Sequence, residues 1–137
     1  MTAFSDLKWD ENGLIPVVVQ DDRTQQVLML AWMNEEALRQ TLTTGYVHFW
    51  SRSRQEQWRK GAASGNVLVM SEIWYDCDGD AILVRATAHG PACHTGEISC
   101  FYRSLSFDDL AGEGSRGGRS ARPAFVWTKE AGEGADF

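Results

Sequence analysis

The chain has 137 residues, of which 43% are hydrophobic, and its formal net charge is −6. This length and apolar content predict a single globular domain with a substantial core. The negative charge argues against general affinity for nucleic acid or an anionic membrane, and no apolar run approaches the roughly 20 residues that span a bilayer. Residues 1–12 lack the features of a secretory signal, so we expect a cytoplasmic protein with reduced cysteines.

The N-terminal part of the chain predicts a hairpin followed by a helix. Residues 14–20 and 27–32 are apolar or β-branched runs separated by polar turn residues. Pro16 fits the start of a strand or an edge strand, because it cannot donate to a ladder. Asn34 is a suitable N-cap, and Gly45 is a suitable stop signal for a helix that runs to about residue 43.

The remaining elements are mostly strands, which makes the fold class α+β and β-rich, with one main helix. The predicted strands cover residues 46–50, 67–75 and 81–88. Residues 61–66 predict a loop, and residues 90–100 predict an irregular segment. We expect a domain over residues 1–110 and an extension over 111–137, in which 111–122 are mobile and 125–127 form a short strand.

A basic stretch lies at residues 51–60, where Glu56 is the one acid among three arginines and a lysine. A local basic patch on an acidic protein suits a small anionic ligand better than a polymer. A solvated loop with scattered charges explains the same pattern equally well, so both interpretations stay open.

An acidic stretch at residues 76–80 reads Asp-Cys-Asp-Gly-Asp. Carboxylates suit Mg²⁺ or Ca²⁺, and in an extended segment the aspartates would face one way and Cys77 the other. An acidic turn is the alternative. An EF-hand is excluded, because Ala81 and Thr87 occupy the places where the calcium loop needs glycine and glutamate.

The three cysteines, Cys77, Cys93 and Cys100, are separated by 16 and 7 residues and contain no Cys-x-x-Cys pair. Three thiolates leave one position of a tetrahedral zinc open, as in catalytic sites. His94 could fill that position or carry a proton near it. The alternatives are free buried thiols and a structural histidine.

Several sequence blocks in order resemble the phosphoribosyl-AMP cyclohydrolase family of histidine biosynthesis, over about residues 14–103. The blocks are Val27–Leu38, Phe49–Arg54, Trp58–Gly61, Ser64–Asn66, Asp76–Asp80, Cys93–Gly96 and Ser99–Phe101. Each block alone is a weak signal, but their shared order is specific.

The resemblance implies two metals and an obligate, intertwined homodimer whose subunits are compact mixed sheets or half-barrels. One Mg²⁺ per subunit would be held by Asp76, Asp78 and Asp80. One Zn²⁺ per subunit would be held by Cys77 of one subunit together with Cys93 and Cys100 of the other.

The implied substrate is the nucleotide 1-(5-phosphoribosyl)-AMP, whose adenine ring opens at the N1–C6 bond when zinc-activated water adds at C6. His94 is the candidate proton carrier. Trp50 or Trp58 could stack on a base. The candidate substrate contacts, chosen for phosphate binding, are Ser51, Arg52, Ser53, Arg54, Lys60, Ser64, Gly65 and Asn66.

The chain departs from the family pattern at Ala62 and Ala63, where relatives carry an acidic residue and a hydroxyl. Its length leaves no room for the pyrophosphohydrolase domain fused to many relatives, so we expect the monofunctional form. Two other readings remain: a zinc nucleobase deaminase, whose His-x-Glu signature the sequence lacks, and a zinc-stabilised interaction module without turnover.

Overall fold

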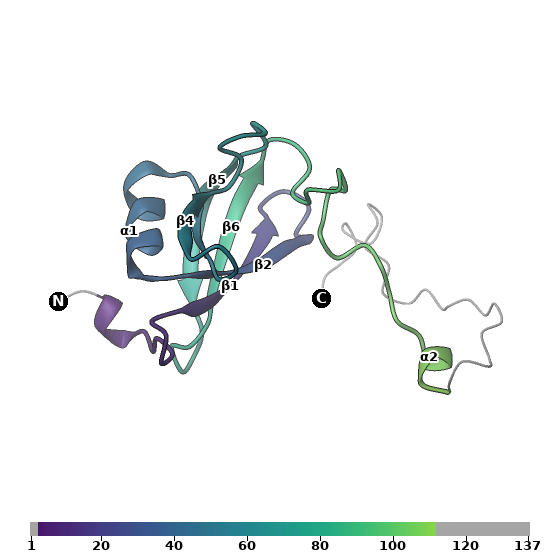
Figure 1. The fold of residues 1–137 in the computed structure, drawn as a ribbon, viewed down its shortest axis with the longest axis horizontal. Coiled ribbons are helices and arrows are strands. Elements are labelled where there is room, and N and C mark those ends of the chain that lie inside the picture. Colours follow the sequence, from purple (N-terminus) through teal and green to yellow (C-terminus); the bar gives the residue numbers. More distant parts are fainter. Residues whose placement is uncertain (1–2, 112–137) are drawn as a thin grey trace. The chain divides into compact units, whose positions relative to one another are not determined.

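The computed structural model describes residues 3–111, which fall into two units divided after Cys100. The second unit contains the helix α2 (Phe107–Ala111). The first unit contains η1 (Ala3–Asp6), β1 (Ile15–Asp21), β2 (Val27–Met33), α1 (Glu35–Thr44), β3 (His48–Ser51), β4 (Glu56–Arg59), β5 (Leu68–Tyr75) and β6 (Ile82–Ala88), as shown in Figure 1.

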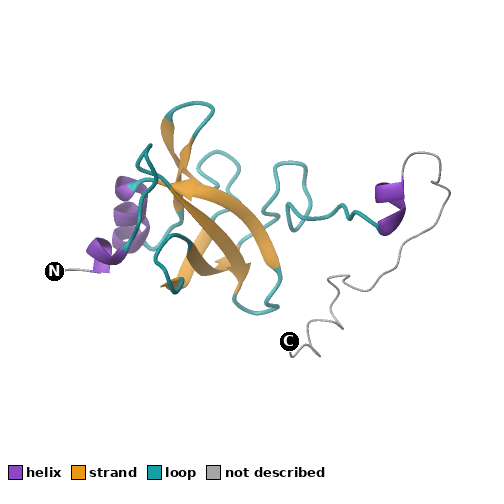
Figure 2. Ribbon diagram, turned by 90° about the horizontal axis from the view of Figure 1, so that it is seen from below, coloured by secondary structure: helices purple, strands orange, loops and turns teal. Residues whose placement is uncertain are grey.

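The first unit is built on a four-stranded mixed sheet in the order β2-β1-β6-β5 (Figure 2). The pairs β1–β2 and β5–β6 are antiparallel, whereas β1 and β6 are parallel. β3 and β4 form an antiparallel ribbon, which joins the start of β5 through the Val47 N–H bonded to the Leu68 carbonyl at 3.0 Å. The predicted mixed sheet is confirmed, and the described strands do not close into a barrel.

The core lies where the inner face of this sheet meets the ribbon and α1. Along β1 the side chains of Ile15, Val17 and Val19 are fully buried, and the residues between them are half-buried. This alternation is the strand period of two. Phe49 of β3 is fully buried and packs against Trp58 of β4, with ring centroids 5.3 Å apart. α1 contacts β2 and β3 and lies on one side of the strands (Figure 1).

Local signals fix both ends of α1. The Asn34 side chain accepts a hydrogen bond from the Ala37 N–H at 2.9 Å, as an N-cap does. Gly45 has φ 83° and donates its N–H to the Thr41 carbonyl at 2.9 Å, which ends the helix. The helix predicted to run to about residue 43 is therefore confirmed to within one residue.

The predicted hairpin is confirmed as β1–β2, and the three later predicted strands are confirmed as β3, β5 and β6. Pro16 lies at the start of β1, as expected. The strand is central in the sheet, but the pairing of β1 with β6 begins only at Val17. β4 is an addition to the prediction. The expectations for residues 112–122 and 125–127 lie outside the described residues. No helix in the described part has the length and apolar character needed to cross a membrane.

Candidate active site

The acidic stretch forms the turn between β5 and β6. The Gly79 N–H donates to the Asp76 carbonyl at 3.0 Å, and the Asp80 N–H donates to Asp76 Oδ1 at 3.0 Å. The turn interpretation is therefore the right one, and the extended segment was wrong. The turn nevertheless brings the three exposed carboxylates of Asp76, Asp78 and Asp80 within 4.8 Å of one another.

The N-terminal segment packs directly on this turn. The Lys8 N–H donates to the Gly79 carbonyl at 2.7 Å, and Lys8 Nζ donates to the Asp78 carbonyl at 2.9 Å. Gly79 has φ 77°, and a Cβ there would clash with the main-chain oxygen of Asp6. The acidic turn is thus held from outside as well as by its own hydrogen bonds.

The closeness of the carboxylates shifts the pKa values of Asp76 and Asp80 in opposite directions. Desolvation raises the pKa of Asp76, but hydrogen bonds from the main chain and side chain of Asp80 outweigh it, and the net shift is downward. The pKa of Asp80 is raised, mainly by its side-chain hydrogen bonds with Asp76 and Asp78. A bound hard cation would relieve this repulsion, so the donor set fits Mg²⁺.

Cys93 and Cys100 form a thiol pair next to β2. Cys93 is buried, and its sulfur accepts a hydrogen bond from the Thr95 hydroxyl at 3.0 Å. The Cys100 N–H donates to the Leu28 carbonyl at 2.8 Å, and the buried Ser99 hydroxyl donates to the Val27 carbonyl at 2.8 Å. These bonds anchor the irregular segment 90–100, which was predicted as such, to the start of β2.

The two sulfurs of the thiol pair differ in proton affinity. The Thr95 hydroxyl lowers the pKa of Cys93, with a smaller contribution from a hydrogen bond with Cys100. Burial raises the pKa of Cys100, and the neighbouring Cys93 raises it further. Cys93 therefore loses its proton more easily than Cys100 does, and a cation between the two sulfurs would stabilise both thiolates.

Cys77 does not join this pair within one chain. It is exposed in the β5–β6 turn. Across the described part of the chain, the aspartates are the one group of three or more potential ligands gathered within 4.8 Å. A single chain therefore offers two sulfurs for zinc, and Cys77 faces solvent.

Lys60 lies near both Trp58 of the β3–β4 ribbon and Cys100 of the thiol pair. Its side chain is buried, with 8% of the residue exposed, and Nζ lies 5.9 Å from the centroid of the Trp58 ring. Its positive charge lowers the pKa of Cys100. The structure therefore separates Lys60 from the exposed end of the basic stretch and places its charge beside a sulfur.

The other end of the basic stretch borders the aromatic hollow, which has a volume of about 540 Å³. Ser51, Arg52 and Ser53 line it, together with Leu30, Ala31, Trp32, Trp50 and Trp58. This volume lies in the range of small-molecule sites. Arg54 does not line it, and pairs instead with Glu56 at 3.3 Å. Arg52, Arg54 and Lys60, predicted together as phosphate contacts, therefore have three different environments.

The remaining predicted site residues lie elsewhere. Ser64, Gly65 and Asn66 belong to the turn after the ribbon and line neither described hollow. The Asn66 side chain packs so closely on Gly90 that a Cβ at Gly90 would clash with it. His94 follows Cys93 directly and is exposed. Ala62 and Ala63 are exposed in the same turn as Ser64.

Sequence reasoning missed three residues that shape this region. Lys8 holds the acidic turn, Thr95 holds the Cys93 sulfur, and Trp32 stacks under the Arg52 guanidinium, with Cζ 4.5 Å from the ring centroid. Thr95 lies within a quoted family block and two residues from a cysteine, so proximity could have marked it. Trp32 also lies within a quoted family block, but its partner Arg52 belongs to a different block, so nothing in the sequence links the two. Lys8 is far from the acidic turn in sequence, and no local pattern indicates it.

The sequence is similar to those of a known protein family. Residues 29–102 match the sequence model of the phosphoribosyl-AMP cyclohydrolase family. The chain is 56% identical over 105 residues to the phosphoribosyl-AMP cyclohydrolase of Archaeoglobus fulgidus, which covers 77% of this chain and 97% of that protein. It is 50% identical over 113 residues to the Methanococcoides burtonii protein of the same name, covering 82% and 93%.

A third relative is the histidine biosynthesis bifunctional protein of Caldanaerobacter subterraneus, 56% identical over 114 residues. The match covers 83% of this chain but 55% of that protein, so the chain spans about half of the bifunctional relative. The chain belongs to the phosphoribosyl-AMP cyclohydrolase family and is an enzyme of histidine biosynthesis. The predicted family and enzyme class are confirmed.

Proposed function

We propose that this cyclohydrolase opens the adenine ring of 1-(5-phosphoribosyl)-AMP at the N1–C6 bond. Water contributes its OH to C6 and a proton to N1, the N1–C6 bond breaks, and C6 becomes a carboxamide carbon. The observation that carries the proposal is the thiol pair, Cys93 and Cys100, anchored on β2 next to Lys60 and the aromatic hollow.

The zinc ligands we propose are Cys93 and Cys100 of one subunit and Cys77 of its partner. When bound there, zinc would supply water whose pKa is lowered to near 7. Two observations support zinc at this place. The neighbouring Cys93 raises the pKa of Cys100, an effect that a cation would offset, and Cys77 is exposed and open to a partner subunit. His94, exposed beside Cys93, is the proposed proton carrier between water and N1.

The Mg²⁺ ligands we propose are Asp76, Asp78 and Asp80. Their carboxylates already lie within 4.8 Å of one another in a turn braced by the N-terminal segment. Three hard oxygen donors from one turn suit a cation that keeps several waters and meets substrate phosphates.

The homodimer we propose is supported by an apolar row on the outer face of the sheet. Leu30, Val18, Leu83 and Trp74 are cross-strand neighbours in that order, one from each of the four strands. Leu30 is 48% exposed and Trp74 is 58% exposed, although both are large and apolar. Such a continuous apolar patch on the surface favours association with another protein.

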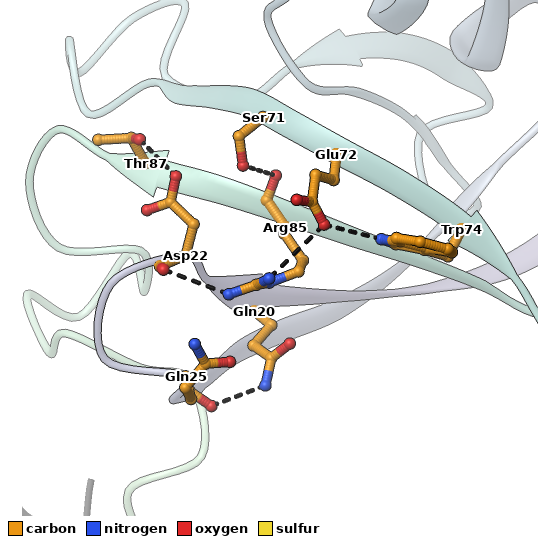
Figure 3. A network of polar contacts seen from close by, with 8 residues as sticks. All are labelled: Gln20, Asp22, Gln25, Ser71, Glu72, Trp74, Arg85 and Thr87. Carbon is orange, nitrogen blue, oxygen red and sulfur yellow. Dashed lines mark hydrogen bonds and ion pairs between the residues drawn. The ribbon is translucent and has the colours of Figure 1, made fainter. Parts of the chain in front are cut away.

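A polar network borders this row on the same face (Figure 3). Arg85, the neighbour of Gln20 on β1, pairs with Glu72 at 3.5 Å and donates to the Asp22 carbonyl at 3.2 Å. Glu72 also accepts the Trp74 indole N–H at 2.9 Å. Arg85 Nε and Asp22 Oδ1 are buried without a hydrogen-bond partner among the described residues. A second subunit on this face would cover the apolar row.

Substrate would lie in the aromatic hollow, with a base against its tryptophans and a phosphate at Ser51, Arg52 and Ser53. Lys60, beside Cys100, lies nearer the reacting end than the phosphate end. Ser64, Gly65 and Asn66 remain proposed contacts from outside this hollow, reached only if substrate extends beyond it.

The test is a direct absorbance assay of ring opening with phosphoribosyl-AMP, combined with measurement of bound zinc. Cys93→Ala should abolish turnover and lower the zinc content while the circular dichroism spectrum stays that of the wild type. Thr43→Ala, an exposed change on α1, is the control and should keep both. Full turnover by a metal-free preparation would contradict the zinc role, and a folded, zinc-loaded wild type without turnover would favour the interaction module.

A further inference from the structure

The two arginines of the ribbon turn are held in different ways. The Arg52 guanidinium lies over the Trp32 ring of β2, 4.5 Å from its centroid, and forms no ion pair within the described residues. The Arg54 Nε lies 3.3 Å from a Glu56 carboxylate oxygen. The charge of Arg54 is therefore paired with a carboxylate, whereas the charge of Arg52 is not.

Arg52 also lies where two hollows meet, a position that it shares with Trp50. It lines the aromatic hollow and a second hollow of about 350 Å³, whose other lining residues are Asn12, Leu14, Asn34, Trp50 and Gln55. Among all the described residues that line these two hollows, Arg52 is the one charged side chain. An anion that enters either hollow meets this guanidinium and no carboxylate.

The main chain beneath Arg52 is fixed as well. Gln55 has φ 55°, a left-handed conformation, and its N–H donates to the Ser51 carbonyl at 2.7 Å. The Gln55 side-chain amide donates to the Arg52 carbonyl at 2.7 Å. These hydrogen bonds fix the main chain of the turn, and the Trp32 ring restricts the guanidinium itself before any ligand arrives, which reduces the entropy lost on binding.

We propose that Arg52 binds a substrate phosphate at the junction of the two hollows and that Trp32 is the positioning residue that holds it there. Arg54 lines neither hollow and pairs with Glu56, so the role falls to Arg52. This inference rests on the proposed nucleotide substrate, because it names the phosphate contact of that same site. Trp32 touches the arginine, and its removal acts on phosphate binding through Arg52.

The test compares adenosine 5′-monophosphate with adenosine, which differ by one phosphate, in calorimetric titrations of the dimeric holoenzyme. Wild type should prefer the monophosphate. Arg52→Ala should reduce that preference about tenfold or more, since a charge-assisted hydrogen bond is lost. Trp32→Leu should reduce it about three- to fivefold, and Trp32→Phe should restore most of it because a ring remains.

Matched controls separate positioning from general damage. Arg39→Ala removes another arginine stacked on a ring, Phe4, with Cζ 5.0 Å from the centroid, and should change nothing. Arg54→Ala should weaken the preference less than Arg52→Ala does. In steady-state assays Trp32→Leu should raise KM for phosphoribosyl-AMP and leave kcat nearly unchanged.

Three results would overturn the proposal: no preference for the monophosphate in wild type, an unchanged preference in Arg52→Ala, or an unchanged preference in Trp32→Leu. These outcomes differ from failure of the proposed function. A wild type that prefers the monophosphate through Arg52 but does not open phosphoribosyl-AMP would contradict the reaction and leave the phosphate site standing. Normal ring opening with no role for Arg52 would contradict the phosphate site and leave the proposed reaction standing.

Discussion

Gly79 offers a direct test of how the acidic turn is held. Its φ of 77° is a left-handed conformation that an alanine adopts at a cost of about 1 kcal/mol. A Cβ would also clash with the Asp6 carbonyl oxygen, so the N-terminal segment must move. That movement sacrifices the bonds from Lys8 to Gly79 and Asp78, which contribute about 1 kcal/mol or less each. We therefore expect Gly79→Ala to lower the free energy of unfolding by about 2–3 kcal/mol.

Gly13 provides the matched control. Its φ is 75°, almost the same as that of Gly79, but a Cβ there would meet nothing within 4 Å. Gly13→Ala should therefore cost only the conformational term, about 1 kcal/mol. The difference between the two variants isolates the close approach of the N-terminal segment to the acidic turn.

Urea denaturation followed by tryptophan fluorescence measures both variants, and Mn²⁺ titration as a stand-in for Mg²⁺ reports on the aspartates. Gly79→Ala should weaken Mn²⁺ binding, whereas Gly13→Ala should not. Equal destabilisation by the two substitutions would refute the reasoning that Asp6 and Lys8 brace the turn.

Two further predictions concern a buried hydrogen bond and the subunit interface. Thr41→Val removes the buried hydroxyl that accepts the His48 N–H at 2.9 Å, and should cost about 1–3 kcal/mol in urea denaturation. The exposed Thr43→Val should cost less than about 0.5 kcal/mol, and a similar loss in both would show that the hydrogen bond is unimportant. If the proposed dimer forms through the apolar row, Trp74→Glu should convert it to monomer in sedimentation velocity, whereas Leu42→Glu, on the similarly exposed face of α1, should not. A dimeric Trp74→Glu protein would place the interface elsewhere.

Elements with local signals were predictable from the sequence. Asn34 and Gly45 mark the ends of α1, because capping depends on residues within one turn of the helix. The hairpin β1–β2 follows from two apolar runs and a short polar connection. β4 escaped prediction because three of its four residues are exposed and polar or charged, so no alternating apolar pattern marks it.

Long-range arrangement was not predictable in the same way. The parallel pairing of β1 with β6 brings Val17 beside Ile82, and no local feature of either strand specifies that partner. The aspartates converge through a turn rather than through strand alternation. The basic stretch is uniform in sequence, but its members have different partners in the structure. Arg54 pairs with Glu56, and Arg52 stacks on Trp32. Lys60 is buried near Trp58 and Cys100.

Mixing Cys77→Ala with Cys93→Ala tests the proposed shared zinc site most directly. Cys77→Ala and Cys93→Ala should each be inactive alone, because each lacks one ligand in both sites of its dimer. Co-expressed, they form heterodimers that assemble one intact site from Cys77 of one subunit and the thiol pair of the other, and the mixture should recover about a quarter of wild-type ring opening. An inactive mixture that contains verified heterodimers, or a fully active Cys77→Ala protein, would contradict a site built by two subunits.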